Sequence, residues 1–264
     1  MVSLELEAKL DNLLATAQKE TEDIDLFAPL AGSEECPICM IPLPIKYIDI
    51  QFYSCCGKDV CNGCIYKHVT ADKANGVSEV DEFKCAFCCQ PPPKNNVKAL
   101  KKLMKKNIPN AFMAMAEHYE QGDDVVQSDT RAIEMYIRAA EIGHVDAFGK
   151  LGNNYQKGVV VEQDMSKALE FYEVGAKKGS LHAHKALAQE HEIRGNVDEA
   201  VRHATVAASA GDKESMDNLM NAYKDESLSK EELTETLRAY QASSNSMKSK
   251  DRDDYRLFEE MHPM

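Results

Sequence analysis

All nine cysteines of this 264-residue chain lie in one short segment, between positions 36 and 89. Eight of them form four pairs, three of the type C-x2-C and one of adjacent residues. The pairs are Cys36 and Cys39, Cys55 and Cys56, Cys61 and Cys64, and Cys85 and Cys88. A C-x2-C turn presents two thiolates from one tight loop, and a structural zinc ion takes four ligands, with Zn–S bonds of about 2.3 Å. The spacing therefore predicts two closed four-cysteine zinc sites and leaves Cys89 as a free thiol.

Dense cysteines also occur as disulfides, but disulfides persist in secreted proteins and are rare in reducing cytosol. The first twenty residues carry Glu5, Glu7 and Asp11 where a signal peptide needs a basic start and an unbroken apolar run. They predict an amphipathic helix instead. No window approaches the roughly 20 apolar residues of a membrane span. We therefore expect a soluble cytoplasmic protein, with a nuclear location also open, whose cysteines bind metal.

The composition changes after Gln90, because the rest of the chain is Ala-rich, helix-forming and free of cysteine. A chain of 264 residues is long enough for two domains. We expect a mainly α protein, with a small zinc module followed by a helical solenoid. The predicted parts are an N-terminal helix and acidic linker (1–34), the zinc module (35–93), a basic connecting helix (94–110), helical repeats with a capping helix (111–242) and a flexible tail (243–264).

The second half of the chain repeats itself with a period of 36 residues. Each unit is predicted to form two short helices with a glycine after each one. The position after a helix often has a left-handed backbone conformation, which favours glycine. The third copy is four residues shorter, and a fourth starts near Leu219. We expect recurring Leu and Tyr positions to fill the core of the stack. These include Leu151, Tyr155, Tyr172 and Leu187, and the recurring small residues include Ala111, Ala147 and Ala183.

The segment AFGKLGNNYQKGVVVEQDMSKALEFYEVGAKKG, residues 147–179, resembles the Sel-1-like repeat, a relative of the tetratricopeptide repeat. It departs from that pattern at Val160, where the loop usually has a second glycine, and at His191, which replaces a tyrosine. We expect His191 to pack in the core rather than to act as a ligand or base. The resemblance implies a stack of helical hairpins whose concave surface recruits a protein substrate or partner.

The order of the cysteine pairs, with CPIC at 36–39 and CCGKDVCNGC at 55–64, resembles the all-cysteine RING finger over about residues 35–93. The resemblance implies a cross-brace with a short β hairpin and a helix, in which the first and third pairs hold one zinc ion and the second and fourth pairs the other. The implied ligands of one ion are Cys36, Cys39, Cys61 and Cys64, and those of the other are Cys55, Cys56, Cys85 and Cys88.

One position departs from the commonest RING pattern, because Lys58 stands where a ligand histidine would follow Cys56-Gly57. Two adjacent cysteines on one ion require a local turn, which Gly57 allows. His68 remains the alternative ligand in place of Cys55 or Cys56, and a shift of the last ligand from Cys88 to Cys89 also remains open. Closed thiolate sites of this kind are structural, because no coordination position is left for water or substrate.

RING fingers bind a ubiquitin-loaded conjugating enzyme and restrain its thioester, which is catalysis by orientation. The resemblance implies that Ile38, Ile65 and Pro91 contact that enzyme and that Gln90 stands where active members often carry a cation. We find no nucleophile, phosphate loop or paired carboxylates, so no catalytic side chain is expected. The first hypothesis is a RING-type ubiquitin ligase with a solenoid substrate arm. The alternative is a non-catalytic, zinc-stabilised interaction scaffold.

The segment KNNVKALKKLMKKN, residues 94–107, carries six lysines and an apolar stripe of Val97, Leu100, Leu103 and Met104. Basic runs can bind nucleic acid. We do not favour this interpretation, because the net charge is −13 and no aromatic residues interleave. A helix that packs on the 110–119 helix, with its lysines in water, explains the pattern. Further on, Ser229 and Glu232 predict a capping box at the start of the last repeat helix.

Overall fold

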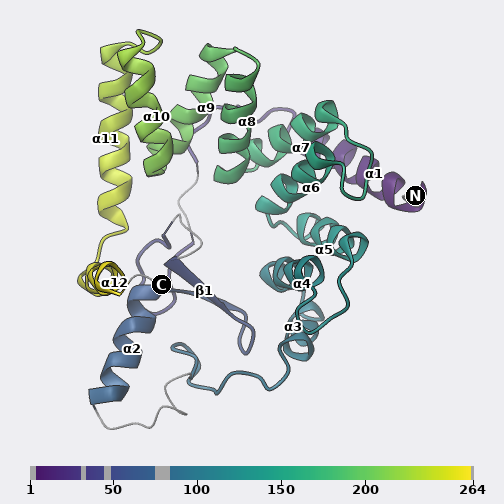
Figure 1. Cartoon of the computed structure of the whole chain (residues 1–264), viewed down its shortest axis with the longest axis vertical. Helices are drawn as coiled ribbons and strands as arrows, with labels where there is room; N and C mark the ends of the chain where they lie inside the picture. The colour runs from purple at the N-terminus through teal and green to yellow at the C-terminus, as the bar shows by residue number, and fades with distance from the viewer. Residues whose placement is uncertain (1–3, 31–33, 45–48, 75–83, 263–264) are drawn as a thin grey trace. The chain divides into compact units, whose positions relative to one another are not determined.

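The computed structural model describes residues 4–30, 34–44, 49–74 and 84–262 and is mainly helical (Figure 1). The chain divides into two compact units, each formed by segments that are distant in sequence. The first unit comprises Met1–Ala31 and Phe112–Ser243, and the second comprises Gly32–Ala111 and Ser244–Met264. Among the described helices, none has the length and apolar character needed to cross a bilayer.

The first unit is a series of helical hairpins, in which neighbouring helices contact each other in chain order from α5 to α10. This confirms the predicted solenoid. The hairpins are α4 (Pro109–Gln121) with α5 (Asp129–Glu141), α6 (Asp146–Lys157) with α7 (Met165–Lys177), α8 (Leu181–Ile193) with α9 (Val197–Ser209), and α10 (Lys213–Lys224) with α11 (Lys230–Ser246).

The predicted core positions of the repeats are buried, each no more than 3% exposed. Close packing within the second hairpin depends on a small residue, because a Cβ added at Gly152 would lie 2.5 Å from the Tyr172 ring. The Tyr172 hydroxyl donates to Asn153 Oδ1 at 2.7 Å, so its polar end is satisfied. The confirmed core residues are Leu151, Tyr155, Tyr172 and Leu187.

The glycines of the period end helices, as predicted. Gly158 lies just after α6 with φ 66°, in the left-handed region, and its N–H donates to the carbonyl of Asn154 at 2.9 Å. Glycine adopts this conformation without the steric cost that a Cβ would add. The recurring glycine therefore sets the direction in which the chain leaves each first helix.

The capping box at the start of α11 is confirmed. The backbone N–H of Ser229 donates to Glu232 Oε2 at 3.0 Å, and the N–H of Glu232 donates to Ser229 Oγ at 3.2 Å. Loss of such a cap costs about 1 kcal/mol. We expect Ser229→Ala to lower the free energy of unfolding by this amount, measured as a shift of the urea midpoint by circular dichroism. An unchanged midpoint would contradict the capping role.

An N-terminal amphipathic helix, α1 (Leu4–Glu20), is confirmed, but it is part of the repeat unit rather than a separate segment. It contacts α5 and α7, and Lys167 of α7 forms an ion pair with Asp11 at 2.7 Å. An amphipathic helix must cover its apolar stripe. The buried residues of this stripe are Leu6, Leu10, Leu13, Leu14 and Ala17.

The second unit contains the predicted β hairpin and helix. Strands β1 (Ile50–Tyr53) and β2 (Lys58–Cys61) pair antiparallel, with Ile50 opposite Cys61, and α2 (Asn62–Ala74) follows directly. The basic segment forms α3 (Asn96–Met104), with Val97, Leu100 and Leu103 buried. Leu103 lies against Gly57 at the hairpin turn, so α3 belongs to the cysteine module's unit.

The prediction of a flexible tail over 243–264 is wrong, because residues Lys250–Met261 form helix α12, which packs against α2. The Ser249 side chain accepts from the Arg252 N–H at 3.3 Å and caps this helix. The segment is polar, yet its Tyr255 and Phe258 rings lie near the ring of Tyr66 on α2. These two aromatic side chains, at helical spacing, give the polar segment an apolar contact that its composition did not reveal.

Candidate metal centre and binding groove

The first cysteine pair lies on a tight loop that turns its two sulfurs to the same side. The N–H of Met40 donates to the carbonyl of Cys36 at 2.9 Å, and the N–H of Cys36 donates to the carbonyl of Ile41 at 3.0 Å. Met40 has φ 57°, a left-handed conformation that a non-glycine residue seldom adopts. Backbone hydrogen bonds and one left-handed residue therefore define the shape of this loop.

The fourth pair repeats this loop. The N–H of Cys89 donates to the carbonyl of Cys85 at 2.8 Å, the N–H of Cys85 donates to the carbonyl of Gln90 at 2.9 Å, and Cys89 has φ 56°. Two loops 49 positions apart in the sequence thus share the same hydrogen bonds and the same left-handed residue. The same geometry recurs because both loops present a pair of sulfurs.

The second and third pairs lie at the two ends of the β2 segment. Cys55 and Cys56 form the hairpin turn, where Gly57 has φ 74° and donates its N–H to the carbonyl of Tyr53 at 2.7 Å. This is the local turn that two adjacent ligands require. Cys61 ends β2 and Cys64 lies in the first turn of α2, where the partial positive charge of a helix N-terminus favours thiolates.

The eight paired cysteines converge in two groups of four, and within each group all four sulfurs lie within 4.8 Å of one another. Measured separations are 3.9 Å for Cys36 to Cys64, 3.9 Å for Cys39 to Cys61, 3.5 Å for Cys55 to Cys88 and 3.8 Å for Cys56 to Cys85. All nine cysteines are free thiols. The first cluster is Cys36, Cys39, Cys61 and Cys64, and the second cluster is Cys55, Cys56, Cys85 and Cys88.

These separations fit a metal site. Four sulfurs at tetrahedral corners, each about 2.3 Å from a zinc ion, lie about 3.8 Å apart, whereas a disulfide bond is only about 2.05 Å long. The two clusters could each hold one metal ion.

Burial favours the neutral, protonated form of several cluster thiols. Burial, opposed by a backbone hydrogen bond at Lys58 and helped by the nearby Cys85 sulfur, raises the pKa of the Cys56 thiol to about 11. Burial likewise raises the pKa of Cys55 and Cys64. Burial acts in the same direction on Cys36, but backbone hydrogen bonds at Cys39 and Cys61 outweigh it and lower the pKa to about 7. Four thiolates cannot share one buried site alone, so binding of a metal ion here would release protons.

The two alternative ligands that the sequence left open, His68 and Cys89, lie outside both clusters. His68 lies on α2 and belongs to neither cluster. Cys89 is exposed and also lies outside both clusters. Among the described residues, the geometry thus favours the adjacent pair Cys55 and Cys56 over the histidine, and Cys88 over Cys89.

Three of the four predicted partner contacts have exposed side chains on or next to the cysteine loops. Ile38 is 40% exposed, and Gln90 and Pro91 are also exposed, whereas Ile65 is half-buried against the core of the first cluster. The sequence analysis missed Phe87, which is 42% exposed. Phe87 occupies the third position of its C-x2-C loop, as Ile38 does, so the repeated spacing could have pointed to it.

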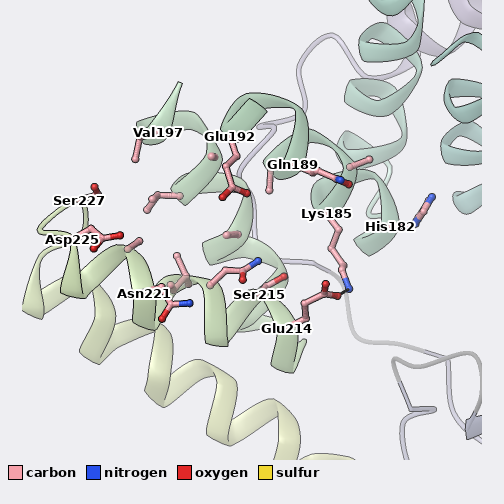
Figure 2. Close-up of a pocket in the computed structure, with 18 of the residues that line it drawn as sticks. His182, Lys185, Gln189, Glu192, Val197, Glu214, Ser215, Asn221, Asp225 and Ser227 are labelled. Carbon is pink, nitrogen blue, oxygen red and sulfur yellow. Dashed lines mark hydrogen bonds and ion pairs between the residues drawn. The ribbon is translucent and has the colours of Figure 1, made fainter. Parts of the chain in front are cut away.

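A second candidate site is a groove in the repeat unit, with a cavity volume of about 760 Å³ (Figure 2). Lys185 at its rim pairs with Glu214 at 2.6 Å and Asp212 at 3.3 Å, so its charge is balanced. Glu192 and Asp225 on the groove wall are exposed. The groove therefore carries acidic charge together with amide groups that can hydrogen-bond a polypeptide. The amide side chains that line it are those of Asn153, Gln156, Gln189, Asn218 and Asn221, of which Asn153 and Gln156 already accept from the Tyr172 hydroxyl.

Comparison with known proteins supports the repeat part of the chain. The family model of the Sel1 repeat matches residues 110–144 and 150–180, whereas no RING family matches. A crystal structure of a Sel1 repeat protein from Oxalobacter formigenes is 24% identical, with a TM-score of 0.51, and the match covers 69% of this chain and 81% of that one. The chain thus contains Sel1 repeats and has the corresponding solenoid fold.

A second solved structure, a protective antigen of uropathogenic Escherichia coli with an SLR fold, is 17% identical with a TM-score of 0.47. That match covers 69% of this chain and 41% of the antigen. Comparison with curated proteins gives no match.

Proposed function

We propose that this protein is a RING-type ubiquitin ligase with two structural zinc ions and a substrate-binding solenoid. The observation that carries the proposal is the interleaving of the cysteine pairs. The first pair lies with the third, and the second lies with the fourth, so the two pairs of each cluster lie on either side of one pair of the other cluster in the sequence. The RING resemblance implies a cross-brace with this order of pairs, and the grouping of the cysteines supports the proposal.

Zinc fits both clusters, and its role there is to stabilise the fold rather than to take part in a reaction. Four cysteines fill the four coordination positions of each ion, which leaves none for water or substrate. When bound, the ions fix the loops that carry Ile38 and Phe87. Catalysis then consists of holding the thioester of a conjugating enzyme so that a substrate lysine can attack it.

Exposed apolar residues on these loops support contact with a conjugating enzyme. Ile38 and Phe87 are 40% and 42% exposed, and Pro91 follows the fourth pair. Apolar side chains held on rigid loops are typical anchors of protein interfaces, because a few such residues carry most of the binding energy.

The groove of the repeat unit supports recruitment of a protein. Solenoid repeats offer extended surfaces of this kind to partners. Its exposed Glu192 and Asp225, beside amide groups, favour an extended segment that carries lysine or arginine. Such a segment also supplies lysines that a ligase can modify.

One residue favours the alternative of a scaffold without ligase activity. The position after the fourth pair, where active RING fingers often carry a cation, is occupied by Gln90, which is exposed. A neutral amide donates a weaker hydrogen bond than a charged group. The scaffold would use the same zinc sites and the same groove but would not activate the thioester.

Discharge of ubiquitin from a loaded conjugating enzyme distinguishes the two functions. We expect the zinc-loaded protein to accelerate discharge from at least one enzyme of a broad panel. Ile38→Ala removes an apolar anchor but no ligand, so it should retain both zinc ions and reduce the rate by about 5- to 30-fold, equivalent to 1 to 2 kcal/mol of contact energy. Zinc content and discharge are measured on the same preparation.

Ile193→Ala is the matched control, because Ile193 is 71% exposed on the repeat unit and lies far along the chain from the cysteines. It should discharge ubiquitin at the wild-type rate. If the wild-type protein holds two zinc ions but discharges no enzyme in the panel, the ligase proposal fails and the scaffold replaces it.

A further inference from the structure

Helix α12 is built into the cysteine module rather than appended to it. It packs along α2, where the ring centroids of Tyr66 and Phe258 are 5.3 Å apart and Lys67 forms an ion pair with Asp251 at 3.0 Å. The Tyr255 hydroxyl accepts from Asn62 Nδ2 at 3.2 Å. These contacts join residues more than 180 positions apart within the second unit.

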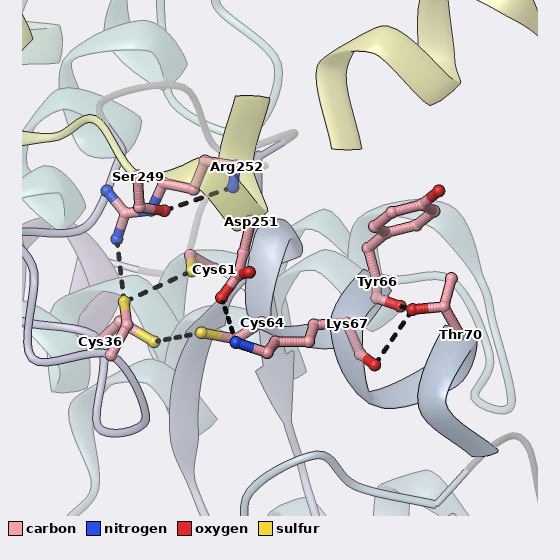
Figure 3. A network of polar contacts seen from close by, with 10 residues as sticks. Cys36, Cys61, Cys64, Tyr66, Lys67, Thr70, Ser249, Asp251 and Arg252 are labelled. Carbon is pink, nitrogen blue, oxygen red and sulfur yellow. Dashed lines mark hydrogen bonds and ion pairs between the residues drawn. The ribbon is translucent and has the colours of Figure 1, made fainter. Parts of the chain in front are cut away.

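Arg252 of α12 reaches the first cysteine loop (Figure 3). Its guanidinium donates to the carbonyls of Pro42 at 2.7 Å and Met247 at 2.6 Å, and it lies 3.6 Å from Cys39 Sγ. The residue is only 4% exposed. Arg252 therefore places a buried positive charge beside the first cluster.

A buried cation is costly unless a negative charge balances it. Carbonyl groups of Pro42 and Met247 supply hydrogen bonds but no charge. The adjacent carboxylate of Asp251 pairs with Lys67, and that of Asp253 lies 3.8 Å from Arg256. Four thiolates and one divalent ion have a net charge of −2, so a metal-filled first cluster supplies the balancing charge that Arg252 requires.

The contact between Arg252 and the first cluster depends on the absence of a side chain at Gly63, which lies between the two cysteines of the third pair. A Cβ added at Gly63 would lie 2.7 Å from the backbone nitrogen of Arg252 and 2.8 Å from its Cα. Any other residue at this position would push α12 away from α2. Close approach of the two helices therefore depends on a glycine next to the ligands.

We propose that Arg252 is an outer-sphere partner of the first metal site, so that α12 controls how tightly that site holds its ion. The guanidinium hydrogen-bonds a ligand sulfur, neutralises part of the cluster charge and ties the first loop to α12 through the carbonyl of Pro42. Groups that support metal ligands in this way change metal affinity by about 10- to 100-fold. The inference rests on the proposed zinc binding and adds a regulator to one site only.

Zinc release from the full-length protein tests this role. A chromogenic chelator should remove two zinc ions from the wild-type protein, and in Arg252→Met one of the two should leave about 10- to 100-fold faster. Methionine retains much of the buried stem but no charge. Arg252→Lys keeps the charge without the forked donor, so its rate should lie between the two. Arg256→Met, on the same helix but exposed at its side chain, should release both ions at wild-type rates.

Cobalt substitution gives a readout that a loss of packing alone would not produce. Loss of a hydrogen bond to a thiolate should shift the sulfur-to-cobalt absorption band of one site in Arg252→Met and leave the other site's band in place. Gly63→Ala, which retains the arginine but displaces the helix, should reproduce the fast release. If Arg252→Met does not fold, the rate of zinc release from Gly63→Ala tests the role of α12 instead.

The outcomes separate this inference from the function on which it rests. A wild-type protein that binds no zinc overturns the proposed zinc sites themselves. A wild-type protein with two zinc ions, whose Arg252→Met and Gly63→Ala variants release them at wild-type rates with unshifted cobalt bands, overturns only the role of Arg252.

Discussion

Removal of zinc by a chelator is expected to unfold the cysteine module and to leave the repeat unit helical. The buried core around the first cluster consists of Cys36, Leu43, Val60, Cys61 and Cys64, and three of these five residues are predicted ligands. So small an apolar core cannot stabilise a module of this size alone. Structural zinc supplies on the order of 10 kcal/mol of apparent binding free energy, which is lost with the ion.

Hydrogen exchange measured by mass spectrometry distinguishes the two units. On zinc removal, backbone amides of β1, β2 and α2 should exchange freely, and those of α12 should follow because the helix packs on α2. Amides of α6 to α9 should keep their protection. Addition of zinc should restore the original pattern. Persistent protection of the hairpin in the zinc-free protein would contradict a structural role for the metal.

A matched pair of cysteine variants controls for the loss of a thiol. Cys61 is fully buried in the first cluster, whereas Cys89 is exposed and belongs to neither. In native mass spectrometry, Cys89→Ser should carry two zinc ions and Cys61→Ser at most one. Equal zinc content in the two variants would remove the basis for the assigned ligand groups.

The convergence of the cysteines could be predicted because each pair is a local feature. A C-x2-C turn fixes two sulfurs within four residues, and the left-handed residues Met40 and Cys89 complete loops whose geometry depends on neighbours in the chain. Only the pairing of one loop with another is long-range. That pairing was predicted from the order of the cysteine pairs, which resembles the RING finger. The 36-residue period likewise predicted the solenoid, because each hairpin contacts its neighbours in sequence.

The helices α1 and α12 show what the sequence could not provide. The apolar stripe of α1 predicted a helix, whereas the segment of α12 was predicted to be a flexible tail. The leucine stripe of α1 also gave no indication that α5 and α7 would be its partners. In α12, Arg252 is one of several charged residues in a polar segment, and only the fold brings it to Cys39. Partner choice between distant elements depends on three-dimensional packing, for which one sequence carries no local signal.

A group of histidines in the repeat unit was also only partly predicted. His191 is half-buried and stacks on His203 at 5.6 Å between ring centroids, in line with its predicted packing role. The sequence analysis did not single out His184 and His203, which are 0% and 1% exposed and whose Nδ1 atoms lie 3.1 Å apart. A histidine on an apolar helix face belongs to no motif, so its burial becomes visible only in the fold.

This histidine pair is expected to make the repeat unit sensitive to acid. One proton between the two Nδ1 atoms gives a donor and an acceptor, whereas two protons leave no acceptor and place two positive charges together. Burial lowers the pKa of His184 to about 4. Burial, followed by the neighbouring His184, His191 and Arg202, lowers the pKa of His203 to about 3.

The direction of the effect follows from proton binding. An unfolded histidine has a pKa of about 6.5, so between pH 6.5 and 4 the unfolded chain binds two protons that the folded pair does not. Stability is complete above pH 6.5 and falls as the pH decreases, by about 1.4 kcal/mol per pH unit for each histidine. The free energy of unfolding at pH 5 should therefore be about 4 kcal/mol lower than at pH 7.5.

Urea unfolding from pH 7.5 to 5, followed by hydrogen exchange of α8 and α9, measures this loss in the unit that contains the pair. His203→Phe keeps an aromatic ring beside Phe27, whose centroid lies 4.8 Å from that of His203, but removes one titrating group, so the loss should fall to about half. His118→Gln, at an exposed hydrogen bond on α4, should behave as the wild type. Acid release of zinc is common to all three proteins and cancels in the comparison. If His203→Phe loses as much stability as the wild type between these pH values, the buried pair is not the origin of the acid sensitivity.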